Sequence, residues 1–185
     1  MDQIGVLCRS AESGFAVLST IAGHDEKDGT CYLQERYDYR AKPCKIKIGV
    51  PDNVLQLSDR ESKESILSFA ESFEWENFEL KYFDVLSQVH YILGCAEISN
   101  NTTRYDGIKF GYRTKSFSEL NELYVKSRTE GFGLHLKLAS IMGCMVLSKE
   151  HYDLLYLKAM KIRRLVKLHC DELFSRYDAI ILPSS

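Results

Sequence analysis

Apolar residues recur at helical spacing in several parts of this 185-residue chain. The clearest stripe lies within residues 149–176 and is formed by Leu155, Ala159, Ile162, Val166, His169 and Leu173. Its alternating steps of four and three predict a helix with one narrow face against a core. Shorter patterns of the same kind predict helices at residues 11–22, 58–73, 84–99, 119–128 and 134–147. We expect Ser10 and Ser58 to cap the first two of these helices.

Three segments have the pattern of short strands. Residues 44–50 alternate polar and apolar positions and stop at Pro51, residues 78–82 alternate again, and residues 179–182 are apolar and precede a proline. Because a helix separates the first two strands, we expect them to be parallel with a right-handed crossover. The polar residues 24–44 are expected to form a long surface loop.

Composition indicates a single globular domain over residues 1–185. The chain is 45% hydrophobic and 27% charged, which is enough to bury a core. A net charge of −2 gives no overall attraction for nucleic acid. The apolar runs are too short for a membrane span and the start lacks the pattern of a signal peptide. We therefore expect a protein of the cytoplasm, or of the mitochondrial or plastid matrix.

Metal chemistry has little support in the sequence. The six cysteines show neither a C-x-x-C pair nor zinc spacing, and we interpret them as small buried hydrophobes in a reducing compartment. The acidic loop from His24 to Asp28 is interpreted as a solvated turn rather than a metal site. We predict no metal site in this chain.

Two short motifs differ from ordinary core or linker sequence. The first, residues 104–113, reads RYDGIKFGYR, and the second, residues 127–133, reads SRTEGFG. Both combine aromatic, charged and glycine residues densely, which is typical of chain that lines a site.

These motifs resemble the A-type subunit of the tRNA-dependent amidotransferases, within the amidase signature family. That family carries R-[YF]-D-G-[IV]-[RK]-[YF]-G-Y followed at this distance by [ST]-R-[ST]-E-G-F-G, and residues 2–9 and 21–28 resemble it as well. The resemblance runs from residue 2 to about residue 183. It implies an α/β chain with a partial amidase-signature fold, in which helices pack on a few-stranded mixed sheet. It also implies strand edges at 45–50, 78–82 and 179–182 that the N-terminal amidase half would pair.

The resemblance also implies which chemistry this chain does not carry. The family uses a Ser–Ser–Lys arrangement, held in a Gly/Ser-rich signature that lies upstream of the segment resembling residues 2–10. No such run occurs in this sequence. We therefore predict no catalytic residue here and expect this chain alone to be inactive.

Five residues are our candidates for substrate binding. Arg128 and Glu130 lie two positions apart and cannot face each other on a helix, so each needs its own partner. We interpret them as bracing the loop that lines the amide pocket, and charge capping of the helix end is an equal alternative. Arg104 and Asp106 invite the same argument, with a purely structural turn as the alternative. Glu97 matches an acid that the family places on the preceding helix, and packing is the alternative there.

Three positions depart from the family pattern. Where the family grips glutamine with an arginine this chain has Ala139, and at the neighbouring position, where the family usually has arginine too, it has Leu138. Where the family uses a tyrosine this chain has His90. Loss of arginine removes a bidentate clamp for a carboxylate.

The leading hypothesis is that this chain is part of an A-type amidotransferase subunit. The whole enzyme of that family hydrolyses glutamine to amidate Glu-tRNA(Gln) or Asp-tRNA(Asn). Its expected partners are B-type and C-type subunits and the N-terminal amidase half, with misacylated tRNA bound indirectly. No cofactor is expected in this chain, and ATP and magnesium would act on the partner subunit. The alternatives are an amidase of another amide and a non-catalytic assembly subunit.

Overall fold

The computed structural model describes residues 4–29, 31 and 45–183. The chain divides into two compact units, Met1–Cys44 and Lys45–Ser185, which are described separately. In the described part of the first unit, the helix α1 (Ala11–Ile21) begins at Ser10, whose Oγ accepts a hydrogen bond from the Ser13 N–H at 3.3 Å. The predicted cap is therefore confirmed. None of the α1 residues is buried within the described residues. Most of the predicted loop, residues 30 and 32–44, lies outside the described residues.

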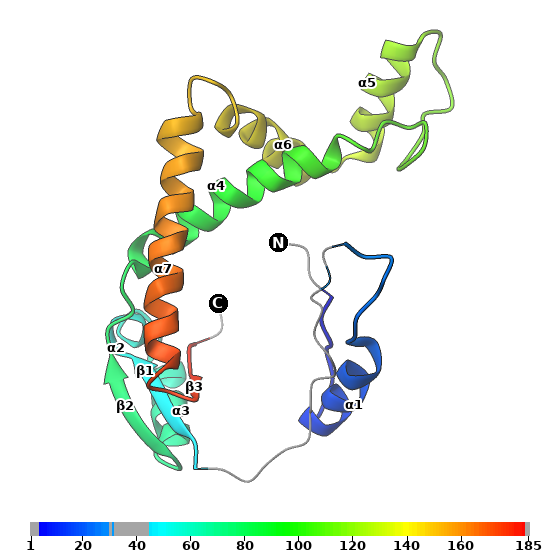
Figure 1. Cartoon of the computed structure of the whole chain (residues 1–185). Helices are drawn as coiled ribbons and strands as arrows, with labels where there is room; N and C mark the ends of the chain where they lie inside the picture. Colours follow the sequence, from blue (N-terminus) through cyan, green and yellow to red (C-terminus); the bar gives the residue numbers. More distant parts are fainter. Residues whose placement is uncertain (1–3, 30, 32–44, 184–185) are drawn as a thin grey trace. The chain divides into compact units, whose positions relative to one another are not determined.

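The second unit contains a sheet of three parallel strands in the order β2-β1-β3 (Figure 1). The strands are β1 (Lys47–Pro51), β2 (Glu74–Phe78) and β3 (Ala179–Ile180). The predicted α/β class and the parallel pairing of the first two strands are confirmed. The described strands are all parallel, whereas we expected a mixed sheet. β2 and β3 form the outer edges of the sheet among the described residues.

β2 lies four residues before the segment predicted for it. Residues 78–82 alternate in sequence, but Leu80 lies in a loop that Asn53 holds. The Asn53 side chain accepts from the Leu80 N–H and donates to the Leu80 carbonyl. Tyr82 has a positive φ of 66°, which ends any extended conformation before the next helix. The pairing with β1, Ile48 opposite Trp75, fixes the observed register.

The crossover between β1 and β2 consists of α2 (Asp52–Leu55) and α3 (Arg60–Ala70). The cap of α3 is Asp59, whose Oδ1 accepts from the Ser62 N–H at 2.9 Å, and not the predicted Ser58, whose hydroxyl donates to a carbonyl of α2. A carboxylate is an equally good cap and it stands one residue closer to the helix. The core beneath the sheet is formed by Ile48, Val50, Leu55 and Ala70.

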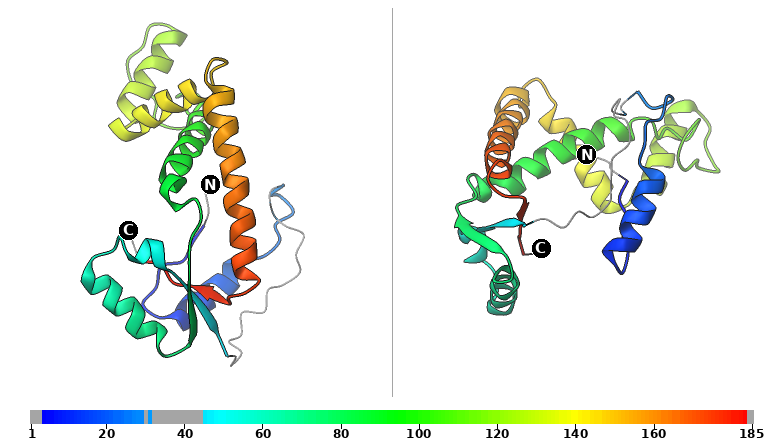
Figure 2. Two further views of the ribbon diagram at one scale, coloured as in Figure 1. Left: turned by 90° about the vertical axis from the view of Figure 1, so that its left-hand side faces the viewer. Right: turned by 60° about the horizontal axis from the view of Figure 1, so that its bottom comes forward.

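The remaining helices are α4 (Phe83–Thr102), α5 (Leu120–Gly131), α6 (Leu134–Val146) and α7 (Lys158–Phe174). α4 and α6 pack side by side, as both views of Figure 2 show. The contact is close because Gly143 faces the backbone of α4, where a side chain would overlap the Cys95 carbonyl. The hydroxyls of Thr102 and Ser140, 3.4 Å apart, join the two helices as well.

The stripe predicted for the last helix is confirmed. Ala159, His169 and Leu173 are buried, and the His169 Nε2 lies 3.3 Å from the Glu79 carbonyl, so this residue is a core histidine as expected. The helix is not α-helical throughout, because Tyr152–Leu157 form a π-helical turn, labelled η1. Such a turn inserts one extra residue per turn, which sequence periodicity does not detect.

The cysteines differ from the expectation. The five that the structure describes are free thiols, but only Cys95 is buried, while Cys8 and Cys144 are exposed. The described helices include none that is long and apolar enough to cross a membrane.

Candidate functional site

The first motif forms a tight loop after the end of α4. The Asp106 Oδ1 accepts hydrogen bonds from the Ile108 N–H (2.7 Å) and the Lys109 N–H (3.2 Å). These bonds, chiefly the one from Ile108, lower the pKa of the Asp106 carboxyl. Gly107 adopts a φ of +77° and a Cβ there would lie 2.5 Å from the Ser127 Oγ, so both conformation and space require glycine.

The second motif lies at the end of α5 and binds the first directly. The Glu130 carboxylate accepts from the Tyr112 hydroxyl (2.8 Å) and from the Thr114 hydroxyl (3.0 Å). The bond to Glu130 raises the pKa of Tyr112. The buried Ser127 Oγ accepts from the Thr114 N–H at 3.1 Å. We call this contact between residues 102–114 and 127–132 the motif junction.

Arg128 points to a different partner from Glu130. Its Nη1 donates to the Thr102 carbonyl at the end of α4, at 3.0 Å, and its guanidinium lies 4.8 Å from the centre of the Phe132 ring. The carbonyls in the last turn of a helix lack intrahelical donors, so a cation there stabilises the helix end. The prediction that Arg128 and Glu130 have separate partners is confirmed.

The structure thus brings three of the five candidate residues into one place. Asp106, Arg128 and Glu130 all belong to the motif junction. Asp106 bonds within its own loop, whereas Arg128 and Glu130 bond to residues of the first motif or the end of α4. Glu97 is partly buried on α4, five residues before its end, and Arg104 is exposed just after it. A direct role of these five in binding substrate stays a prediction.

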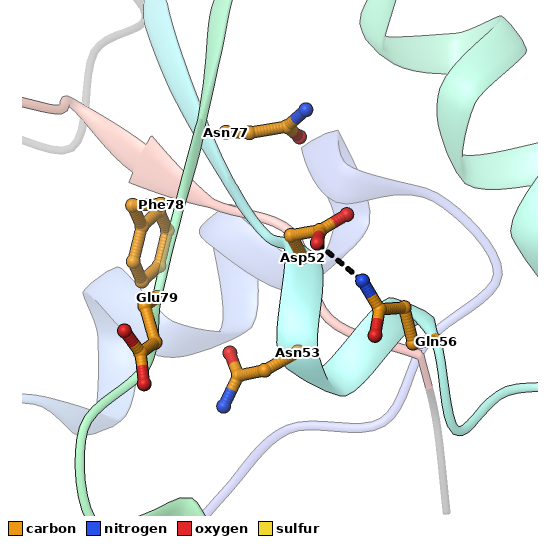
Figure 3. A pocket seen from close by; sticks show the side chains of 6 residues that line it. All are labelled: Asp52, Asn53, Gln56, Asn77, Phe78 and Glu79. Carbon is orange, nitrogen blue, oxygen red and sulfur yellow. Dashed lines mark hydrogen bonds between the residues drawn. The ribbon is translucent and has the colours of Figure 1, made fainter.

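A second polar region, which the sequence did not predict, lies at the carboxyl ends of β1 and β2. A cavity of about 430 Å³ is lined there by Asp52, Asn53, Gln56, Asn77, Phe78 and Glu79 (Figure 3). In the figure, the Gln56 amide donates to the Asp52 carboxylate along one side of α2. Ligands of open parallel sheets bind at this end of the strands. The polar pair Asp52 and Asn53 directly after Pro51 was the signal available in the sequence.

A larger neighbouring cavity of about 900 Å³ shares Asn53, Gln56 and Glu79 and continues along the first turns of α4 to His90. His90 is the position at which the resemblance implies a glutamine-binding tyrosine. Ala139, the position of the implied arginine, is partly buried on α6, and Leu138 beside it is half exposed. The described side chains include no group of three His, Cys, Asp or Glu residues placed to hold a metal ion.

The bonded pair of motifs and the α/β arrangement agree with the amidase resemblance. The family model for Amidase matches residues 1–185, so the chain belongs to this family. It is 40% identical to the A-type subunit of glutamyl-tRNA(Gln) amidotransferase from Lachnoclostridium phytofermentans, over 100% of this chain and 40% of the relative. The proteins of the same name from Lachnospira eligens and Agathobacter rectalis are 37% and 35% identical, over 99% and 100% of this chain and 40% and 39% of their own length. The chain therefore spans about two fifths of the curated relatives it matches.

Proposed function

We propose that this chain forms the substrate-side wall of the amidase cavity in a glutamine-dependent amidotransferase. The whole enzyme hydrolyses glutamine and passes the ammonia to a misacylated Glu-tRNA(Gln) or Asp-tRNA(Asn), which is activated with ATP on a partner subunit. B-type and C-type subunits are the proposed partners. The observation that carries the proposal is the motif junction, in which both family motifs bond to each other in a chain related over its whole length to A-type subunits.

The residues of this chain would position the amide rather than attack it. Glu130 fixes Tyr112 and Thr114, and Arg128 ties the same segment to the end of α4. The loop shaped by Asp106 is thereby held rigid, as a wall that orients a substrate must be. The attacking hydroxyl and its base would come from the part of the amidase chain that the curated relatives have and this chain lacks. ATP and magnesium would act on the partner subunit.

A non-catalytic assembly subunit is the second candidate. It is favoured by Ala139, because a methyl group cannot replace the guanidinium that would hold the carboxylate of glutamine. His90 lines the larger cavity and could donate one hydrogen bond to a ligand, but it cannot supply the missing bidentate clamp.

The two candidates differ in one measurable reaction. We would co-express this chain with the section of the Lachnoclostridium phytofermentans relative that has no counterpart here, together with that organism's partner subunits, and measure ammonia release from glutamine. Turnover is expected in the assembled complex. Ala139→Arg is expected to lower the KM for glutamine at least tenfold by restoring a charge-assisted clamp.

His135→Arg serves as the matched control, because it adds the same side chain at an exposed position one turn away on α6. It is expected to leave the KM within about twofold, whereas an equal gain from both variants would indicate general electrostatics. An assembled complex that releases no ammonia, with or without Ala139→Arg, would support the assembly role instead. Turnover by this chain alone would contradict our account of the nucleophile.

A further inference from the structure

The helix α6 exposes a straight stripe of large apolar side chains. Its members are Leu134 (67% exposed), Leu138 (51%), Ile141 (68%) and Met145 (39%). The steps of four, three and four place all of them on one narrow face of the helix. A face of this kind is the seam through which one helix packs against another.

The stripe is not the face through which α6 packs in this unit. Gly143 and Ser140 contact α4, and they lie on a different side of the helix from Ile141 and Met145. The helix therefore has two faces that are suited to packing, and only one of them is covered among the described residues.

The chemistry of the stripe points to a permanent partner. Residues 138–148 contain no charged side chain, so the exposed face has no charged rim along this length. Nucleic acid would require cations for its phosphates. Permanent interfaces resemble a protein core cut in two, while transient ones are more polar.

We propose that this stripe docks against the section of amidase chain that the curated relatives carry and this chain does not. The inference rests on the proposed function. More than half of each relative's length has no counterpart here, so a large body of the same family is available as a permanent neighbour. A second copy of this chain is the other occupant, and the test below distinguishes it by its oligomeric state.

The test measures association separately from activity. The chain is co-expressed with the section of the Lachnoclostridium phytofermentans relative that it lacks, and the Kd is measured from the dissociation of the purified complex on dilution. The double variant Leu138→Asp, Ile141→Asp is expected to weaken binding at least a hundredfold, because two carboxylates would be desolvated at the seam. Val125→Asp is the matched control on α5, where Val125 is 57% exposed, and is expected to change the Kd less than threefold.

Circular dichroism melts establish that each variant is folded. Should the double aspartate variant not fold, Leu138→Ala, Ile141→Ala is expected to weaken binding about tenfold. Normal binding by a folded stripe variant, or no binding by the wild-type chain, would overturn the docking inference. A wild-type homodimer that the stripe variant dissociates would overturn it as well and assign the face to a second copy. A stable complex that releases no ammonia would contradict the proposed function and still support the docking inference.

Discussion

The parallel sheet and the motif junction of this chain are stabilised by different means. In the sheet region, Val50 and Leu55 are almost fully buried and packing of apolar side chains provides the stability. In the motif junction, Tyr105, Ile108 and Phe110 are between 42 and 57% exposed. Hydrogen bonds to Asp106 and Ser127 hold the backbone there, and the Glu130 carboxylate holds two side-chain hydroxyls. Apolar packing in the sheet region stabilises the fold. Hydrogen bonds in the junction fix the conformation of an irregular loop whose aromatic side chains are exposed.

Deleting a core side chain tests the first half of this comparison and has the largest expected effect. Leu55→Ala should lower the free energy of unfolding by about 3 kcal/mol, because it removes buried methyl groups and leaves a cavity beneath the sheet. Urea denaturation followed by circular dichroism measures the change. Leu57→Ala is the control, since Leu57 is 77% exposed, and its effect should stay within about 0.5 kcal/mol. Equal losses in the two variants would mean that the sheet region has no packed core.

The same division explains what the sequence could predict. The strand–helix–strand pattern predicted a parallel pair correctly, because apolar periodicity records which faces are buried. The exact position of β2 was wrong, because residues 78–82 alternate regularly whereas Asn77 interrupts the alternation in residues 74–78, and the pairing with β1 places the strand there. The π-helical turn at Tyr152–Leu157 was missed for a related reason, since the hydrogen-bond pattern changes there while the apolar spacing does not.

In the motif junction, the sequence predicted that partners exist but not which ones. The two-residue separation of Arg128 and Glu130 was enough to require different partners. Their identities, the Thr102 carbonyl and the hydroxyls of Tyr112 and Thr114, depend on the path of an irregular loop. The cavity lined by His90 was not predicted at all, because it joins the ends of strands and a helix that meet only in the folded chain.

Removing the central carboxylate of the junction tests the second half of the comparison and has a smaller, local effect. Glu130→Ala deletes the acceptor of the Tyr112 and Thr114 hydroxyls and should cost about 1 kcal/mol of local stability. Amide hydrogen exchange at Ile108, Lys109 and Thr114 should accelerate about fivefold, while exchange in β1 stays unchanged. Glu119→Ala is the control, because Glu119 caps α5 without a side-chain bond. Acceleration throughout the sheet would show that the two regions unfold as one.

The smallest expected effect is a pH dependence confined to the start of α5. The Glu122 carboxylate pairs with Lys126 and accepts from the Ser118 N–H and hydroxyl, each at 2.6 Å. These contacts, led by the bond from Lys126, lower the pKa of Glu122 from 4.5 to about 2. A group whose pKa is lowered by folding stabilises the fold fully above its unfolded pKa, here 4.5, and that contribution is lost as the pH falls from 4.5 to about 2.

Hydrogen exchange in the first turns of α5 should therefore accelerate as the pH is lowered through this window, after correction for the intrinsic exchange rate. Glu122→Gln should abolish most of the pH dependence, because an amide does not titrate there. Lys126→Met removes the leading cause of the pKa shift and should reduce the slope without abolishing it. If the slope were the same in the wild type and in Glu122→Gln, other carboxylates would hold this end of α5.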